Sequence, residues 1–316
     1  MTKIDMRDAF FKQLVASARI DNRIVFLSAD HGAFALKEFE EDMPDRYINI
    51  GIAEQNMVGV AAGLAASGKI VFIYGISPFV SLRVLEQLTI DVAAMQLPVN
   101  VISVGAGFTY STDGPTHHGL QDISAIATIP GITILNSSDP VNTRAFVEMA
   151  ISSEKPHYIR IEKEKLNEFF SNVDKRKLNT DGYSTLKSCK SKILIISTGL
   201  ISHLALEIAE IFSSQNSIEI AVFDVFRIKP LSERLLDRLR EFKVVIVLEE
   251  SYKSVLASEL ALQILDKNLG IYLTVVTCGE KFFFQGSSRE EMLREAGLSK
   301  ELIIDAINKI LEKQIQ

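Results

Sequence analysis

Short apolar runs alternate with helix-length segments through both halves of the chain, and this alternation limits the fold more than any other feature. Runs that predict strands lie at residues 23–29, 47–50, 69–74, 99–104, 132–135, 157–161, 193–197, 218–223, 244–248 and 272–277. Segments that predict helices include 5–18, 58–66, 79–95 and 300–311. Strands alternating with helices form βαβ units, and continuous apolar runs are typical of strands covered on both faces. The sequence therefore predicts an α/β fold with mostly parallel sheets covered by helices.

A polar stretch with charge runs, such as Asp174–Lys177, separates two blocks of this alternation. The chain has 316 residues, which is long enough for two domains, and 47% of them are hydrophobic, so each block can form a core. We therefore predict a first domain at 1–162, a linker at 163–190 and a second domain at 191–316.

Charge and composition narrow the classes of partner and compartment. A formal net charge of -6 leaves no basic excess to neutralise phosphates, which argues against a nucleic-acid partner. No apolar run approaches the ~20 residues of a membrane span, and Met1–Phe10 contains no signal-peptide core. Cys189 and Cys278 stand alone, so we expect a reduced, cytoplasmic setting.

Several polar or aromatic residues follow the predicted strands of the first domain. In open parallel sheets, ligands bind outside the carboxyl ends of the strands. Asp30, Glu54, Phe79 and the loop at 105–122 all come after such strand ends. We therefore expect them to gather at one edge of the first sheet.

Glu54 heads a helix of very small residues, Val58–Ala66, in which Gly59 and Gly63 lie one turn apart. Each interior glycine costs about 1 kcal/mol relative to alanine, so two of them indicate that another backbone or subunit approaches closely. The carboxylate is either a chemical group or a helix-start acid that interacts with the helix dipole.

The segment Thr112–Asp122 combines an acid, two adjacent histidines and several turn formers. Histidine readily moves protons near neutral pH, and Asp113 and His117 are close enough in sequence to face one polyol substrate. A tight turn with side-chain-to-backbone hydrogen bonds is the alternative. A metal site has less support, because no Cys, and no His or Glu at helical spacing, completes a ligand set.

Arg160 and Phe79 are the remaining candidates. Arg160 lies in a predicted strand near its carboxyl end, where its fork of donors is suited to a phosphate; a surface ion pair is the alternative. Phe79 begins a predicted helix, where a lone aromatic ring either contacts a ligand or belongs to the core.

Taken in order, these stretches resemble the C-terminal half of transketolases, enzymes that use thiamine diphosphate. Ile50–Met57 is similar to the family segment whose acid meets the aminopyrimidine of the cofactor, and Thr112–His117 is similar to its substrate loop. Further similar stretches are Leu27–Asp30, Asp91–Ala94, Ser197–Leu200 and Phe226–Leu231. The resemblance covers nearly the whole chain. It implies a thiamine diphosphate pyrimidine-binding domain followed by a transketolase C-terminal domain.

The resemblance also implies roles for the candidate residues. Glu54 would be the catalytic acid that contacts the aminopyrimidine, Phe79 would stack on that ring, and Asp30 would lie near the cofactor. Asp113 and His117 would contact substrate hydroxyls, and His117 would also assist proton transfer.

Full-length transketolases carry a preceding domain whose Gly-Asp-Gly segment and asparagine hold Mg²⁺ (or Ca²⁺) and the diphosphate. This chain contains no Gly-Asp-Gly segment. The resemblance therefore implies one subunit of a split transketolase, which meets a separate N-terminal subunit through the helix after Glu54 and forms a heterotetramer. The pair would transfer a two-carbon ketol unit from a ketose, free or phosphorylated, to an aldose.

Two alternatives share this fold: the beta subunit of a 2-oxo acid dehydrogenase, and a non-catalytic assembly subunit. The Asp113–His117 segment favours transketolase over the dehydrogenase, and Glu54 together with His117 argues against a non-catalytic chain.

Three departures from the family pattern concern the substrate side. Arg160 would bind a substrate phosphate, but a phosphate-binding histidine common in the family is replaced by Gly105 or its neighbour. Phe108–Thr112 replaces a glycine-rich approach, and an aromatic cluster is reduced to Leu82 and Leu85. The sequence thus predicts an intact cofactor pocket and leaves the sugar and its phosphate open.

Overall fold

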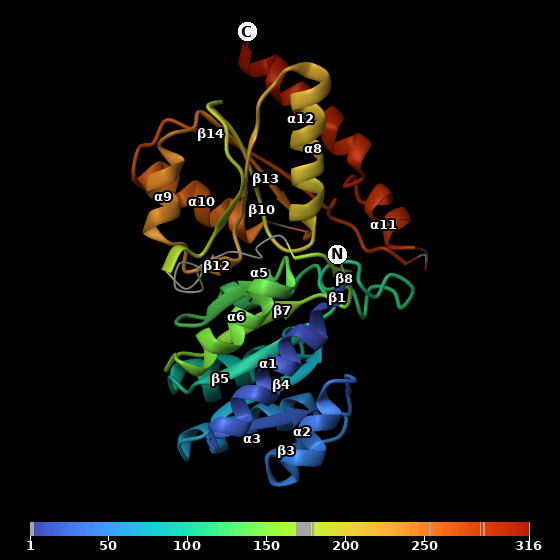
Figure 1. The fold of residues 1–316 in the computed structure, drawn as a ribbon, viewed down its shortest axis with the longest axis vertical. Coiled ribbons are helices and arrows are strands. Elements are labelled where there is room, and N and C mark those ends of the chain that lie inside the picture. Colours follow the sequence, from blue (N-terminus) through green and yellow to red (C-terminus); the bar gives the residue numbers. More distant parts are fainter. Residues whose placement is uncertain are drawn as a thin grey trace.

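The computed structural model describes residues 3–168, 178, 180–252, 254–284, 286 and 288–315. Figure 1 shows two stacked α/β domains, with the second domain (yellow to red) above the first (blue to green). Each domain is built on a mostly parallel sheet with helices packed against it, so the predicted fold class is confirmed.

A seven-stranded sheet in the order β12-β6-β7-β5-β4-β2-β3 organises the first domain. Its strands are β2 (Ile24–Ser28), β3 (Tyr47–Asn49), β4 (Ile70–Ile76), β5 (Val99–Val104), β6 (Thr133–Asn136), β7 (His157–Ile161) and β12 (Arg227–Lys229). Neighbours pair in parallel, except that β12 and β6 are antiparallel. All residues of β2 and β5 are buried, as expected for strands covered on both faces, and β5 buries the polar Asn100 and Ser103 among its apolar residues.

Helices connect the strands of the first domain and cover its sheet. They are α1 (Met6–Ile20), α2 (Leu36–Asp42), α3 (Glu54–Ala66), α4 (Leu85–Gln87), α5 (Asp122–Ala127) and α6 (Pro140–Ile151), with the short η1 (Pro44–Arg46) and the π-helix η2 (Leu88–Ala94). Two short strands, β1 (Ile4–Asp5) and β8 (Lys165–Leu166), form a separate antiparallel pair.

The helix predicted at 79–95 begins later than expected. After β4 the chain runs through consecutive turns until Val84, and only then do α4 and η2 follow. The hydroxyl of Ser81 bonds the carbonyl of Ser77 at 2.6 Å, and Thr89 bonds that of Leu85 at 2.7 Å. Hydroxyls that bond a carbonyl four residues back perturb a regular helix. These turns carry Phe79.

The second domain contains a five-stranded sheet in the order β14-β13-β10-β11-β9. Its strands are β9 (Ser184–Lys187), β10 (Ile193–Ser197), β11 (Ala221–Asp224), β13 (Val244–Glu249) and β14 (Tyr272–Thr277). Its helices are α8 (Ile201–Asn216), α9 (Glu233–Leu239), α10 (Val255–Asp266), α11 (Arg289–Glu295) and α12 (Lys300–Ile315). Within the range predicted as a linker, β8 and β9 are strands, and residues 169–177 and 179 lie outside the described part of the chain.

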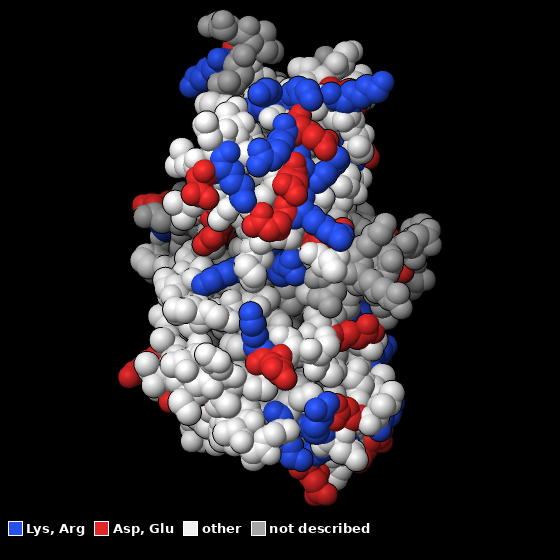
Figure 2. Space-filling view, turned by 90° about the vertical axis from the view of Figure 1, so that its left-hand side faces the viewer, with Lys and Arg blue, Asp and Glu red and all other residues white. Residues whose placement is uncertain are grey.

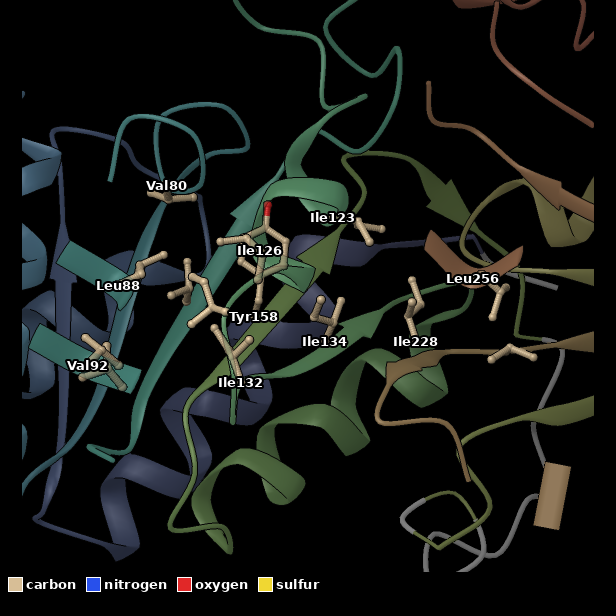
Figure 3. Close-up of a cluster of buried hydrophobic side chains, with 14 of the residues drawn as sticks. Val80, Leu88, Val92, Ile123, Ile126, Ile132, Ile134, Tyr158, Ile228 and Leu256 are labelled. Carbon is tan, nitrogen blue, oxygen red and sulfur yellow. The ribbon is translucent and has the colours of Figure 1, made fainter. Parts of the chain in front are cut away.

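The two domains share backbone pairing and core. Strand β12 comes from the second half of the sequence, yet it pairs with β6, where Arg227 faces Leu135. Figure 3 shows one buried apolar cluster that extends from Val80 and Leu88 in the first domain to Ile228 and Leu256. An interface this apolar holds two domains in one arrangement, so loops from both domains can build a single site.

The surface mixes charges of both signs. On the face in Figure 2, Lys and Arg side chains lie among Asp and Glu side chains, and most of them gather over the upper half. Among the described helices, none is both long and apolar enough to cross a bilayer.

Candidate active site

The carboxyl ends of β2, β3, β4 and β5 lie at the same edge of the first sheet, because these strands are parallel neighbours. The segments that follow them carry Asp30, Glu54, Phe79 and the 105–122 loop. The structure brings Glu54, Phe79 and His117 together there through a chain of side-chain contacts.

Glu54 is the first residue of α3 and is only 5% exposed. The turn before it needs Gly51, whose φ of 75° is disfavoured for other residues, and the amide of Gly51 donates to Oδ1 of Asn49 at 2.9 Å. The carboxylate thus lies at the positive end of a helix dipole, and its Oε2 accepts a 2.8 Å hydrogen bond from Nη1 of Arg83. A buried acid with one cationic partner is the centre of the site.

Arg83 connects Glu54 to an aromatic group. Its guanidinium carbon lies 4.2 Å from the centroid of the Phe79 ring. The Phe79 ring meets the His117 ring edge-on at 5.2 Å between centroids, and Tyr110 lies 6.2 Å beyond His117. Sequence reasoning missed Arg83 and Tyr110. The one sequence signal for Arg83 is a cation four residues after an aromatic residue.

The two adjacent histidines point to different places. His117 is half-buried beside Phe79, and its Nδ1 lies 2.9 Å from Oγ1 of Thr116. His118 is buried against Phe108, 5.2 Å between ring centroids, where burial lowers its pKa. Asp113 is exposed near the tip of the same loop. Of the two histidines, only His117 contacts the Phe79 ring of this group.

Asp30 closes the edge where β2 and β3 end. Its φ is 55°, its amide donates to Oδ1 of Asn49 at 3.1 Å, and its Oδ1 accepts from Nδ2 of Asn49 at 3.2 Å. The residue is exposed and contacts none of the Glu54 group through these bonds. Its contact with a cofactor stays a prediction.

Arg160 does not join this group. It is 2% exposed, its Nε lies 3.0 Å from Oδ2 of Asp122, and it donates to the carbonyl of Gly119. The hydroxyl of Tyr158 donates to the same Asp122 oxygen at 2.8 Å. The guanidinium is therefore committed to a buried network, a placement that disfavours the predicted phosphate contact.

Other cations lie at the same edge, around Tyr110. Nζ of Lys163 is 5.3 Å from the centroid of the Tyr110 ring, and the His31 ring is 5.0 Å from that of Tyr74. Burial lowers the pKa of His31, and the nearby charges of Arg7 and Lys163 lower it further. Arg7, which is ion-paired with Asp5 at 3.3 Å, and Lys163 are the two positive groups, and they hold His31 toward its neutral form. This cluster was not predicted from the sequence, because Arg7, His31 and Lys163 come from separate segments.

The second domain holds the 105–122 loop. Arg289 pairs with Glu162 at 3.1 Å and with Glu250 at 2.6 Å, and also donates to the hydroxyl of Thr109 at 3.2 Å. These groups are mostly buried, so their hydrogen bonds and charges fix the loop firmly.

Comparison with known proteins explains this arrangement. Residues 2–168 match the pyrimidine-binding domain of transketolase, and residues 182–303 match the transketolase C-terminal domain. The chain belongs to the transketolase family. The resemblance noted in the sequence is thereby confirmed.

The transketolase relatives include separate subunits. The chain is 32% identical to the 6-deoxy-6-sulfo-D-fructose transketolase subunit SqwH of Clostridium sp. (strain MSTE9), over 98% of this chain and 95% of the relative. It is 29% identical to one subunit of the apulose-4-phosphate transketolase of Phocaeicola vulgatus, over 98% of each chain. A solved structure described as a split gene transketolase, inactive beta4 tetramer, superposes with a TM-score of 0.85 at 28% identity, covering 97% of this chain and 98% of that one.

The residues present fit the pyrimidine half of the transketolase cofactor. Arg83 shows that a flat group with N–H donors fits between Glu54 and Phe79, since its guanidinium bonds the first and stacks on the second. An aminopyrimidine is also flat and can also hydrogen-bond a carboxyl group, through its ring nitrogen. Among the described residues, no group of three or more His, Cys, Asp or Glu side chains is arranged to hold a metal ion.

Proposed function

We propose that this chain is the C-terminal subunit of a thiamine diphosphate-dependent transketolase, a transferase that moves a two-carbon ketol unit from a ketose to an aldose. The observation that carries the proposal is the series of contacts that joins a buried carboxylate, Glu54, through Arg83 to the rings of Phe79 and His117 at the ligand-binding edge of a parallel sheet. The transketolase ancestry of the chain supports the choice of cofactor.

Each residue has a distinct task in this proposal. Glu54 holds a proton at the ring nitrogen of the aminopyrimidine, Phe79 orients that ring by stacking, and Asp30 lies at the rim. The chemistry that thiamine diphosphate supplies when bound is a nucleophilic carbon for the sugar carbonyl. Asp113 accepts a hydrogen bond from a sugar hydroxyl, and His117 exchanges protons with the sugar oxygens.

The exposed face of α3 supports a separate N-terminal subunit as the partner. A Cβ atom added at Gly59 or Gly63 would meet nothing within 4 Å, so this face is open to another backbone. Large apolar side chains are exposed just before α3 and on or directly after η2, which packs against α3: Ile52 is 78%, Ile90 56% and Met95 65% exposed. We propose that the partner docks here, supplies Mg²⁺ (or Ca²⁺) and the diphosphate site, and forms a heterotetramer with this chain in the cytoplasm.

The cations around Tyr110 support an anionic sugar as the substrate. Lys163 lies 5.3 Å from the centroid of the ring, and the charge of Arg7, which is ion-paired with Asp5, acts on both Tyr110 and His31. The names of the two relatives refer to a sulfo-sugar and a sugar phosphate. We therefore propose a sugar with a phosphate or sulfonate group, bound by this cluster rather than by Arg160.

Reconstitution tests the proposal against its alternatives. The chain is purified alone and together with an N-terminal transketolase subunit from the same genome, and each sample is assayed for ketol transfer between sugar phosphates and for pyruvate decarboxylation. We expect ketol transfer only from the pair and only with thiamine diphosphate. Decarboxylation without ketol transfer would identify a 2-oxo acid dehydrogenase subunit, and turnover by the single chain would contradict the split enzyme. A non-catalytic subunit would leave the partner equally active without it.

A further inference from the structure

Arg83 makes both of the contacts that the proposed function assigns to the cofactor ring. Its Nη1 donates to Oε2 of Glu54 at 2.8 Å, and its guanidinium carbon lies 4.2 Å from the centroid of Phe79. The carboxylate that would bond the aminopyrimidine and the ring face on which it would stack are therefore covered by one side chain.

A guanidinium resembles an aminopyrimidine in the properties that matter at this position. Both are flat, both hydrogen-bond a carboxyl group through a nitrogen at their edge, and both stack on aromatic faces. We propose that Arg83 occupies the aminopyrimidine position in the cofactor-free subunit and must leave it when thiamine diphosphate binds. This inference rests on the proposed function and adds to it a residue that controls cofactor affinity.

The burial of Glu54 gives a reason for such a substitute. The Glu54 side chain is 6% exposed, and a carboxylate that deep in the protein is costly without a charged partner. Arg83 supplies that partner before the cofactor arrives.

The position of Arg83 also allows it to leave. Its side chain is 43% exposed, and the residue lies in the turns between β4 and α4, not inside a helix. The guanidinium can therefore rotate into solvent while Val80 and Val84 on the same segment stay buried in the core.

Displacing Arg83 costs cofactor affinity, because an ion pair and a stacking contact are lost before the cofactor ring gains its own contacts. Such contacts are individually modest when half-exposed. We expect removal of the guanidinium to tighten binding of thiamine diphosphate about tenfold, which corresponds to about 1.4 kcal/mol.

The test compares three variants of the assembled subunit pair. Arg83→Met keeps the aliphatic stem and loses the charged plane, and Arg83→Lys keeps the charge without the plane. Arg23→Met is the matched control, since Arg23 forms a 2.7 Å ion pair with Asp21 on the exposed surface. The dissociation constant of thiamine diphosphate is measured by titration calorimetry at fixed Mg²⁺. We expect about tenfold tighter binding for Arg83→Met, a smaller gain for Arg83→Lys and no change for Arg23→Met.

A second measurement uses the isolated chain, without cofactor. Arg83→Met should lower the unfolding midpoint more than Arg23→Met does, because Glu54 loses its partner. Equal or weaker cofactor binding by Arg83→Met would overturn the inference even if wild-type binding depends on Glu54. If the wild-type pair binds no thiamine diphosphate, or binds it equally well with Glu54→Gln, the proposed function itself fails and this inference fails with it.

Discussion

The carboxylate of Glu250, at the end of a strand in the second domain, accepts a 2.7 Å hydrogen bond from the backbone amide of Phe108 in the 105–122 loop of the first domain. Arg289 pairs with the same carboxylate at 2.6 Å. The loop that carries Asp113 and His117 is therefore positioned by groups from the other domain.

Gly107→Ala tests this contact between domains. A Cβ at position 107 would lie 2.1 Å from Oε1 of Glu250, so alanine must push the carboxylate away from Arg289. Gly114→Ala is a matched control, since both glycines have positive φ values, 54° and 77°, but a Cβ at 114 meets nothing within 4 Å. Backbone strain should lower the free energy of unfolding by about 1–2 kcal/mol in both variants. In Gly107→Ala the displaced carboxylate of Glu250 should lower it by about 3 kcal/mol more. Urea unfolding of the chain measures both, and equal losses would contradict the role of Glu250.

Glu54→Gln tests the acid itself. The glutamine keeps the size of the side chain but cannot hold a proton at the cofactor ring, so we expect kcat of the assembled pair to fall by at least about 100-fold. Glu86→Gln, an exposed position on α4, serves as the control for charge removal and should leave kcat unchanged. The unfolding midpoint of both variants should stay near that of the wild type. Near-normal turnover by Glu54→Gln would exclude this acid assignment.

Long, apolar strands could be predicted from the sequence, whereas short, polar strands could not. The strands β2, β4 and β5 are mostly apolar, with Asn100 and Ser103 as the polar residues of β5, so a run of hydrophobic residues marks each of them in the sequence. Strand β12 contains only three residues, Arg227–Lys229, and pairs with a strand of the other domain. No local period marks such a strand, because its pairing partner is distant in sequence.

The candidate site could likewise be predicted from the sequence only in part. Glu54, Phe79 and His117 could be placed at one edge because each follows a strand end. Arg83 was missed because its contacts depend on turns where the pattern predicts a helix.

The environment of Arg160 could not be predicted for a different reason. Its strand β7 lies between β5 and β6 in the sheet, a position that the order of strands in the sequence does not reveal. Burial in the middle of the sheet then gives Arg160 an internal partner, Asp122.

Gly105 and Tyr110 form a pair whose coupling can be measured. Gly105 has a φ of 97°, and a Cβ there would lie 2.4 Å from Cε2 of Tyr110. The ring thus fills the space beside Gly105. In a Tyr110→Ala background, Gly105→Ala should lower the free energy of unfolding by about 1–2 kcal/mol through backbone strain alone. When the Tyr110 ring is present, the same substitution should lower it by about 1–2 kcal/mol more. Urea unfolding of the four proteins measures this difference, and strictly additive losses would show that the ring does not fill that space.

The buried carboxyl group of Asp224 should make the stability of the chain depend on pH. The residue is fully buried, its carboxylate accepts hydrogen bonds from Ser138 at 2.6 Å and Ser202 at 2.8 Å, and burial raises its pKa from 3.8 to about 7. Between pH 4 and pH 7 the folded chain therefore holds a proton that the unfolded chain has released. The protonated Asp224 therefore contributes up to about 4 kcal/mol to the free energy of unfolding. This contribution is fully present below about pH 4 and is lost as pH rises to about 7.

Asp224→Asn removes this pH dependence. The free energy of unfolding of the variant, relative to that of the wild type, should therefore rise from pH 4 to pH 7 and stay constant above pH 7. His157 acts in the opposite sense over the same range, since burial lowers its pKa from 6.5 to about 4 and its contribution is lost as pH falls. Because both proteins retain His157, the difference between their unfolding free energies at each pH isolates Asp224. Urea unfolding at intervals from pH 4 to pH 8 gives that difference. Parallel curves for the two proteins would show that Asp224 is ionised in the folded chain throughout, held by its two serine donors.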